Sequence, residues 1–286
     1  MIKVLFFIFI TSLFIKADSI NIGLYGLDKK VANEKTVKRL MEKFLSDIKG
    51  LENLEVSVTT YYDEKILKED YLLNKLNLFY LTPSLYIKYF KFFNENTKDL
   101  IILKDSADNH TQYLSLVNKT SKIESYKHLN DKNVSFYTNH NLSKLWFIKR
   151  YYEETNNKNI SFHIKDYANF NQHKKILDVY FNKLDLAVVP SHVWEIAKSL
   201  NPKIVQRVEI FDKSEKIFPS VVGLFNKNYN QSIIKTHKEY INNEKNKDRI
   251  KKILSLVRYQ TVESIDKTTY KQAHEFYKKY EKYFYE

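Results

Sequence analysis

Two hydrophobic periodicities alternate along the first 120 residues. Short apolar or alternating runs predict strands at 20–25, 54–62, 76–81 and 100–103. Apolar residues at helical spacing predict the helices between them, at 30–49, 64–73 and 85–93. Strands that alternate with helices at this interval indicate an α/β architecture with mostly parallel sheets and right-handed crossovers.

The same alternation resumes in the second half of the chain. The predicted strands there are 134–137, 160–164, 184–189 and 204–210. The predicted helices are 122–129, 142–154, 170–181 and 192–200. A short strand at 112–117 precedes this unit, a return strand at 218–225 follows it, and the pattern from Gln231 to the end is helical.

This order predicts two α/β lobes, each a mostly parallel sheet flanked by helices. Lobe 1 is discontinuous and comprises residues 18–111 and 217–286, whereas lobe 2 comprises residues 112–216. Two segments near 108–116 and 212–218 are expected to join the lobes. Binding in such a molecule closes the lobes by a hinge, because a ligand that touches both favours the closed state.

The first 17 residues have the composition of a secretory signal. A basic start is followed by a dozen almost wholly apolar residues, too few to span a bilayer comfortably, and then by the small residue Ala17. We expect cleavage after Ala17, with an uncleaved anchor or a buried strand as the alternatives. The chain has no cysteine, which excludes lipoprotein acylation and disulfides. The expected location is the periplasm.

Charge does not point to nucleic acid. The chain carries 47 Lys and Arg against 34 Asp and Glu, a formal charge of +13. The lysines are scattered over polar helix faces rather than clustered, and export removes the usual partner, so we expect no nucleic-acid binding. A basic surface still attracts small anions weakly.

A strand, a polar turn and a helix start follow one another at 133–154. Thr138 lies in the turn, Asn141 is a good N-cap, and Ser143 follows in the first helical turn. Unpaired backbone N–H groups and the helix dipole at such a start both favour an anion. Most turns of this kind bind nothing, so the pattern alone is a weak signal.

Sequence motifs for catalysis are missing. There is no cysteine, GxSxG, phosphate loop or HExxH, and paired carboxylates such as Asp63 and Glu64 lie in local charged runs. No spacing of His, Asp and Glu suits a metal. The sequence therefore predicts no enzyme, no metal and no cofactor, with an exported α/β hydrolase or transferase as the less favoured alternative.

Four stretches resemble the phosphate- and phosphonate-type periplasmic solute-binding proteins of ABC importers. They are the strand exit and helix start at 80–86, the polar turn at 138–143, the pair Gln172-His173 with the strand at 185–189, and the return strand through Pro219. The resemblance covers most of the chain after Ala17. It implies the two-lobed type 2 periplasmic-binding fold and capture of a small oxyanion such as phosphate or a phosphonate.

The resemblance also implies ligand contacts. In lobe 2 they are Thr138, Asn141, Ser143 and His173, and in lobe 1 they are Tyr61, Tyr62, Tyr80 and Thr82. His173 lends positive charge to an oxyanion if it is protonated; the alternative is a surface histidine. Thr82 replaces a glycine of the family, so its hydroxyl either contacts the ligand or narrows the cleft.

Three departures from the family pattern limit the ligand prediction. Leu142 replaces a hydroxyl donor, and Lys144 replaces a glycine. Pro190 stands where aminophosphonate binders carry an aspartate, which argues against an aminoalkylphosphonate because proline cannot pair a cation.

The expected partners are a small anionic solute and an ABC permease, with the chain acting as a monomer. The alternative is a sensing role, in which the chain presents its liganded or empty state to a membrane sensor kinase. The sequence does not distinguish uptake from sensing.

Overall fold

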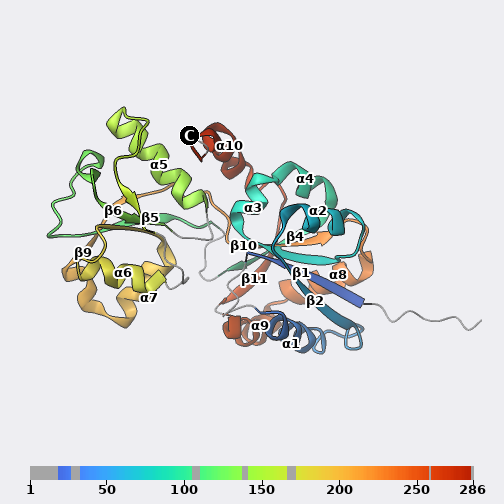
Figure 1. Ribbon diagram of the computed structural model, residues 1–286. Coiled ribbons are helices and arrows are strands. Elements are labelled where there is room, and N and C mark those ends of the chain that lie inside the picture. The colour runs from blue at the N-terminus through green and yellow to red at the C-terminus, as the bar shows by residue number, and fades with distance from the viewer. Residues whose placement is uncertain are drawn as a thin grey trace, which may run out of the picture.

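The computed structural model describes residues 19–26, 33–104, 110–136, 141–165, 172–257 and 259–284. The predicted signal therefore lies outside the described residues. Figure 1 shows two α/β lobes side by side, each with a central sheet between helices. This confirms the expected two-lobed α/β fold.

Lobe 1 contains a six-stranded sheet in the order β11-β4-β10-β3-β1-β2. Its strands are β1 (Ser19–Tyr25), β2 (Glu55–Tyr61), β3 (Leu78–Leu81), β4 (Thr97–Lys104), β10 (Val221–Asn226) and β11 (Thr261–Ile265). Its helices are α1 (Glu34–Leu45), α2 (Glu64–Leu72), α3 (Pro83–Lys88), α4 (Phe90–Asn96), α8 (Gln231–Asn242), α9 (Lys247–Leu254) and α10 (Lys271–Tyr280). Short 3₁₀ turns complete it: η3 (Glu244–Asn246), η4 (Ser255–Val257) and η5 (Glu281–Phe284).

Lobe 2 contains a five-stranded sheet in the order β7-β6-β8-β5-β9. Its strands are β5 (Tyr113–Asn118), β6 (Asn133–Ser135), β7 (His163–Ile164), β8 (Leu186–Pro190) and β9 (Val208–Lys213). Its helices are α5 (Asn141–Thr155), α6 (Gln172–Tyr180) and α7 (Ser191–Leu200), with 3₁₀ turns η1 (Tyr126–Leu129) and η2 (Pro202–Gln206).

The chain crosses between the sheets twice, from β4 to β5 and from β9 to β10. The two crossings are hydrogen-bonded to each other: the Thr111 N–H donates to the Phe218 carbonyl at 2.6 Å, and Gln112 Nε2 donates to the Ser214 carbonyl at 2.6 Å. The boundaries proposed at 111/112 and 216/217 fall in these segments.

The crossings fix which edges of the two sheets face each other. β4 leaves lobe 1 at its carboxyl end, and β1 and β3 run parallel to each other with their ends in register, Tyr25 beside Leu81. In lobe 2 the start of β5 lies beside the end of β8, as Tyr113 pairs with Pro190. The carboxyl ends of the parallel strands of both lobes therefore face the junction, where ligands of open α/β sheets bind.

The sheets are mixed rather than mostly parallel in their pairings. β10 is antiparallel to both neighbours, and β5 likewise pairs antiparallel with β8 and β9. Each of these strands enters its lobe from the junction, so it runs opposite to strands that end there.

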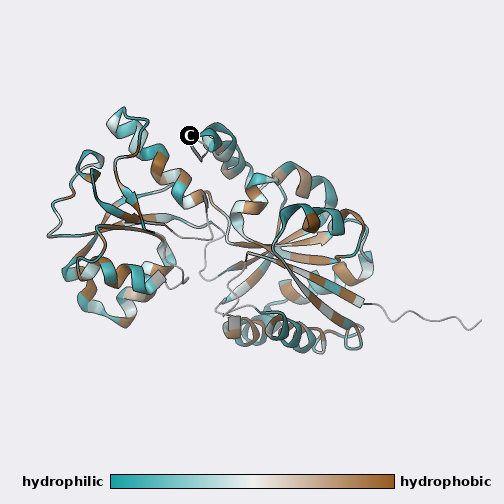
Figure 2. Cartoon of the chain, in the orientation of Figure 1, coloured by the Kyte–Doolittle hydropathy of each residue, from teal (hydrophilic) through white to brown (hydrophobic). Residues whose placement is uncertain are grey.

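The lobe 1 sheet is buried on both faces. Along β3, Leu78 and Tyr80 pack toward α1, α8 and α9, whereas Phe79 and Leu81 pack toward α2 to α4. The second of these cores continues into lobe 2. Figure 2 shows apolar residues along the strands and polar residues on the outer helical turns.

Several predicted elements were wrong in type or extent. The C-terminal region is not wholly helical, because 261–265 forms β11 at the sheet edge beside β4. The predicted helix at 122–129 is the short turn η1, and the helix at 85–93 divides into α3 and α4. The strand expected at 204–210 starts only at Val208.

The C-terminal helix connects the two lobes. Helix α10 and the turn η5 belong to lobe 1 in the sequence order but contact α5 of lobe 2 (Figure 1). The Tyr152 and Tyr283 rings meet edge to face at 4.9 Å. Among the described residues, no helix has both the length and the apolar character needed to cross a membrane.

Candidate functional site

Three helices of lobe 2 begin at the junction edge of its sheet. β6 ends at Ser135 shortly before α5 begins at Asn141, and β8 leads directly into α7 at Ser191. The first turn of α6 reaches the same edge, because Lys175 contacts the Phe136 carbonyl beyond β6. Helix starts carry unpaired N–H groups and the positive end of the dipole, so this edge favours an anion.

Lys175 places a buried amino group at this edge. Its side chain has no exposed surface, and its Nζ donates to the Phe136 carbonyl oxygen. Amino N–H groups donate hydrogen bonds to oxyanions, so this side chain adds to the donors at the helix starts. Sequence reasoning missed Lys175, because a lysine on a helix is usually solvated and only the fold shows its burial.

The predicted lobe 2 contacts lie at or beside this edge. Ser143 is fully buried in the first turn of α5, and His173 is half-buried as the second residue of α6. Asn141 is the first residue of α5, but its side chain lies outside the described part of the chain, as does Thr138. The buried Ser135 hydroxyl, at the end of β6, has no hydrogen-bond partner among the described residues.

The lobe 1 edge carries a charged network centred on Glu64, at the start of α2. Its carboxylate accepts hydrogen bonds from Lys88 Nζ at 2.7 Å, the Tyr89 hydroxyl at 2.7 Å and the Tyr25 hydroxyl at 3.4 Å. Burial works against the charge, but the Lys88 and Tyr89 hydrogen bonds outweigh it, so the pKa of Glu64 is lowered. Glu64 therefore stays ionised and holds Lys88 and two tyrosines in place.

The two adjacent tyrosines at the end of β2 differ in orientation. The Tyr61 hydroxyl donates to Asp70 of α2 at 2.9 Å, and burial together with this bond raises the pKa of Tyr61. The Tyr61 hydroxyl is thus already hydrogen-bonded to Asp70 within lobe 1. Tyr62 is 70% exposed, so it is the member of the pair that is accessible to a ligand.

Thr82 caps α3 with its backbone and packs against the turn after β1. A Cβ atom at Gly26 would lie 2.8 Å from Thr82 Cγ2, and Gly26 has φ +66°, so both the space and the conformation require glycine there. Thr82 therefore packs closely against this turn, and its expected role at the ligand cleft stays a prediction. Two residues on, the Ser84 hydroxyl is buried without a partner in the described structure.

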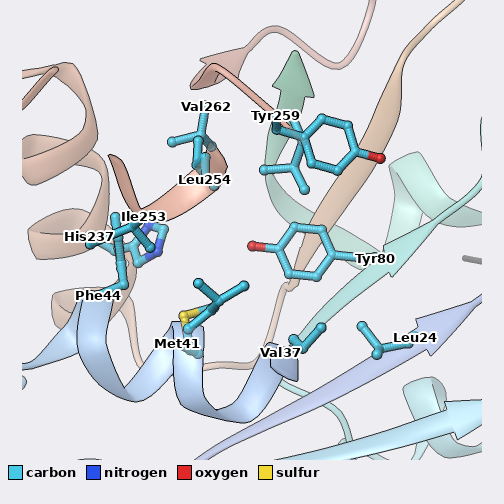
Figure 3. A pocket seen from close by; sticks show the side chains of 12 residues that line it. Leu24, Val37, Met41, Phe44, Tyr80, His237, Ile253, Leu254, Tyr259 and Val262 are labelled. Carbon is cyan, nitrogen blue, oxygen red and sulfur yellow. The ribbon is translucent and has the colours of Figure 1, made fainter. Parts of the chain in front are cut away.

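Tyr80 does not point to the junction edge. Its side chain is on the α1 side of the sheet, within a cavity whose lining is almost wholly apolar (Figure 3). The sequence prediction assumed that the end of a strand presents its side chain to the ligand, but the alternation along β3 turns Tyr80 to one face of the sheet. Apolar surroundings do not suit an anion, so the site proposed below does not include Tyr80.

No group of three metal-ligating side chains gathers within the described residues. The junction edges instead combine helix starts, hydroxyls and a buried lysine. Groups of these kinds are the ones that hydrogen-bond oxyanions in proteins.

A family model described as the ABC transporter, phosphonate, periplasmic substrate-binding protein matches residues 31–270. This range spans most of the chain. The chain belongs to this family. Phosphonate-type substrate-binding proteins are solute-binding proteins that work with an ABC permease, and this agrees with the resemblance found in the sequence. The comparison with curated proteins gave no match.

Solved structures of similar fold include PhnD1 of Prochlorococcus marinus in complex with methylphosphonate. That chain is 16% identical, with a TM-score of 0.65, and the match covers 92% of this chain and 98% of that one. A binding protein of an ABC phosphonate transporter from Pseudomonas aeruginosa is 14% identical, with a TM-score of 0.59 and coverage of 93% and 88%. The aliphatic sulphonate binding protein SsuA of Escherichia coli is 10% identical, with a TM-score of 0.54 and coverage of 92% and 87%. At these identities the likeness is one of fold.

Proposed function

We propose that this chain binds a small phosphate-like or phosphonate-like oxyanion between its lobes and delivers it to an ABC permease. The observation that carries the proposal is the lobe 2 edge, where α5, α6 and α7 begin and where the buried Lys175 donates to the Phe136 carbonyl. The N–H groups and dipoles of the helix starts and the Lys175 amino group all favour an anion there. The two solved relatives from phosphonate transport support the ligand class.

In this proposal the anion lies at the start of α5. The first N–H groups of the helix and the Ser143 side chain donate to it, and the His173 and Lys175 side chains add further N–H donors. Tyr62 and the Glu64–Lys88 network approach from lobe 1. Because contacts come from both lobes, anion binding favours the closed arrangement.

Titration calorimetry of the chain without residues 1–17 tests the ligand class. The panel comprises phosphate, phosphite, methylphosphonate and a short alkanesulfonate, with a neutral sugar and a small amine as controls. We expect binding of at least one phosphorus oxyanion and none of the controls. Binding of a control with no response to any oxyanion would overturn the proposal.

Two neighbouring lysines provide a matched pair of variants. Lys175→Met removes the buried charge, and we expect a 10- to 100-fold weaker oxyanion affinity, the range for a charged hydrogen bond. Lys174→Met makes the same change in net charge one residue earlier, where the side chain is 55% exposed and pairs with Asp178. It should change the affinity less than twofold. Equal losses in both variants would show that net charge alone attracts the anion.

Uptake and sensing differ in the membrane partner. Uptake predicts that the liganded chain is retained by membranes that contain its ABC permease. Retention by a sensor kinase instead would overturn the delivery step while leaving the anion site intact.

A further inference from the structure

Lobe 1 contains a cavity that the anion site does not use. It has a volume of about 80 Å³ and lies between the sheet and helices α1, α8 and α9. Apolar side chains, including Leu24, Met41 and Ile253, form nearly all of its wall. Engineered apolar cavities of about 150 Å³ remain dry and bind small organic molecules such as benzene.

Two buried polar groups interrupt this apolar wall. Tyr80 is 8% exposed, and its hydroxyl makes no hydrogen bond to the described residues. His237 is 2% exposed, and its Nδ1 has no hydrogen-bond partner in the described part of the chain. Figure 3 shows the Tyr80 hydroxyl pointing across the cavity toward the His237 imidazole.

The cavity favours a neutral occupant. Among the described residues, no charged side chain lines it, and burial lowers the pKa of His237 to about 4, so the imidazole is neutral near pH 7. An unpartnered buried donor or acceptor is costly, and a molecule that supplies the missing hydrogen bond removes that cost. Packing of a hydrocarbon group against the apolar wall is favourable, because it removes apolar surface from water.

We propose that this cavity is a binding site for a small neutral alcohol. Its hydroxyl hydrogen-bonds with Tyr80 and His237, and its short hydrocarbon body packs against Leu24, Met41 and Ile253. The site is separate from the proposed anion site, because it lies within lobe 1 on the α1 side of the sheet. The inference does not depend on the proposed function.

Isobutanol and xenon are matched probes for this site. Isobutanol has a hydroxyl and a branched hydrocarbon body, whereas xenon reports only the apolar space. Binding is followed through the ring resonances of His237 in a histidine-labelled chain, assigned with His237→Leu. We expect both probes to shift these resonances, with a millimolar dissociation constant for isobutanol, as suits a ligand of so few atoms.

The variant Tyr80→Phe removes only the hydroxyl. Isobutanol should bind about two- to tenfold more weakly to it, while xenon binding should be unchanged. Val262→Phe places a ring in the cavity wall and should abolish binding of both probes. Circular dichroism checks that each variant is folded.

Three results would overturn the inference. The first is the absence of any shift at His237 with either probe, which is the result if the cavity holds only water. The second is isobutanol binding that leaves the His237 resonances unmoved, because the alcohol then binds elsewhere. The third is equal isobutanol affinity in wild type and Tyr80→Phe.

Discussion

The buried imidazole of His237 should make this protein lose stability as the pH falls below neutral. His237 lies in α8, fully enclosed between the Phe44 and Phe225 rings at centroid distances of 5.0 and 5.1 Å. Burial lowers its pKa from 6.5 to about 4. In the unfolded chain His237 therefore binds a proton near pH 6.5, whereas in the folded chain it binds that proton only near pH 4.

The sign and size of the effect follow from this difference. Where the unfolded state binds more protons, the free energy of unfolding falls as the pH falls. The loss begins near pH 6.5 and is complete below pH 4. A shift of this size corresponds to about 3 kcal/mol, since each pKa unit is worth about 1.4 kcal/mol.

His237→Leu removes the titrating group and keeps a helix-forming, apolar side chain at this position. We expect the wild type to lose about 3 kcal/mol more than this variant between pH 7 and pH 4. At pH 7 the variant should be about 1 kcal/mol more stable, because the unpartnered Nδ1 is gone.

Urea unfolding followed by far-UV circular dichroism measures both quantities. Dichroism is preferable to tryptophan fluorescence, because Trp146 and Trp194 both lie in lobe 2. Ile234→Val, in the same helix and core, is the control: it should lower stability equally at every pH. Parallel pH profiles for wild type and His237→Leu would refute the reasoning.

Two further predictions concern packing. Gly223→Ala should lower the free energy of unfolding by about 1–3 kcal/mol, because the new Cβ would lie 2.7 Å from Ile101 Cγ1 and 2.8 Å from Tyr80 Cε1; an unchanged urea midpoint would contradict this. The Tyr152–Tyr283 contact between the lobes should give a coupling of about 0.5–1.5 kcal/mol in a double-mutant cycle with leucine at each position. If the two single changes had additive effects on the free energy of unfolding, the Tyr152–Tyr283 contact would not stabilise the packing of the C-terminal turn against α5.

The sequence alone determined the class of fold and the two-lobed order of the chain. Long apolar runs such as β4 and periodic helices such as α1 carry a local signal, because their residues bury a face wherever the element packs. The position of the α5 start after β6 followed from the same signal. The family resemblance was readable from short stretches around Pro83, His173 and Pro219.

Tertiary structure decided which side chains face the site. β11 was missed because a short strand at a sheet edge is specified by its pairing with β4 rather than by its own pattern. The orientation of Tyr80 and the burial of Lys175 were not predicted, for a related reason. A strand end presents alternate residues to opposite faces, and a lysine is buried only where distant elements cover it, so neither orientation is encoded within a few residues of the side chain.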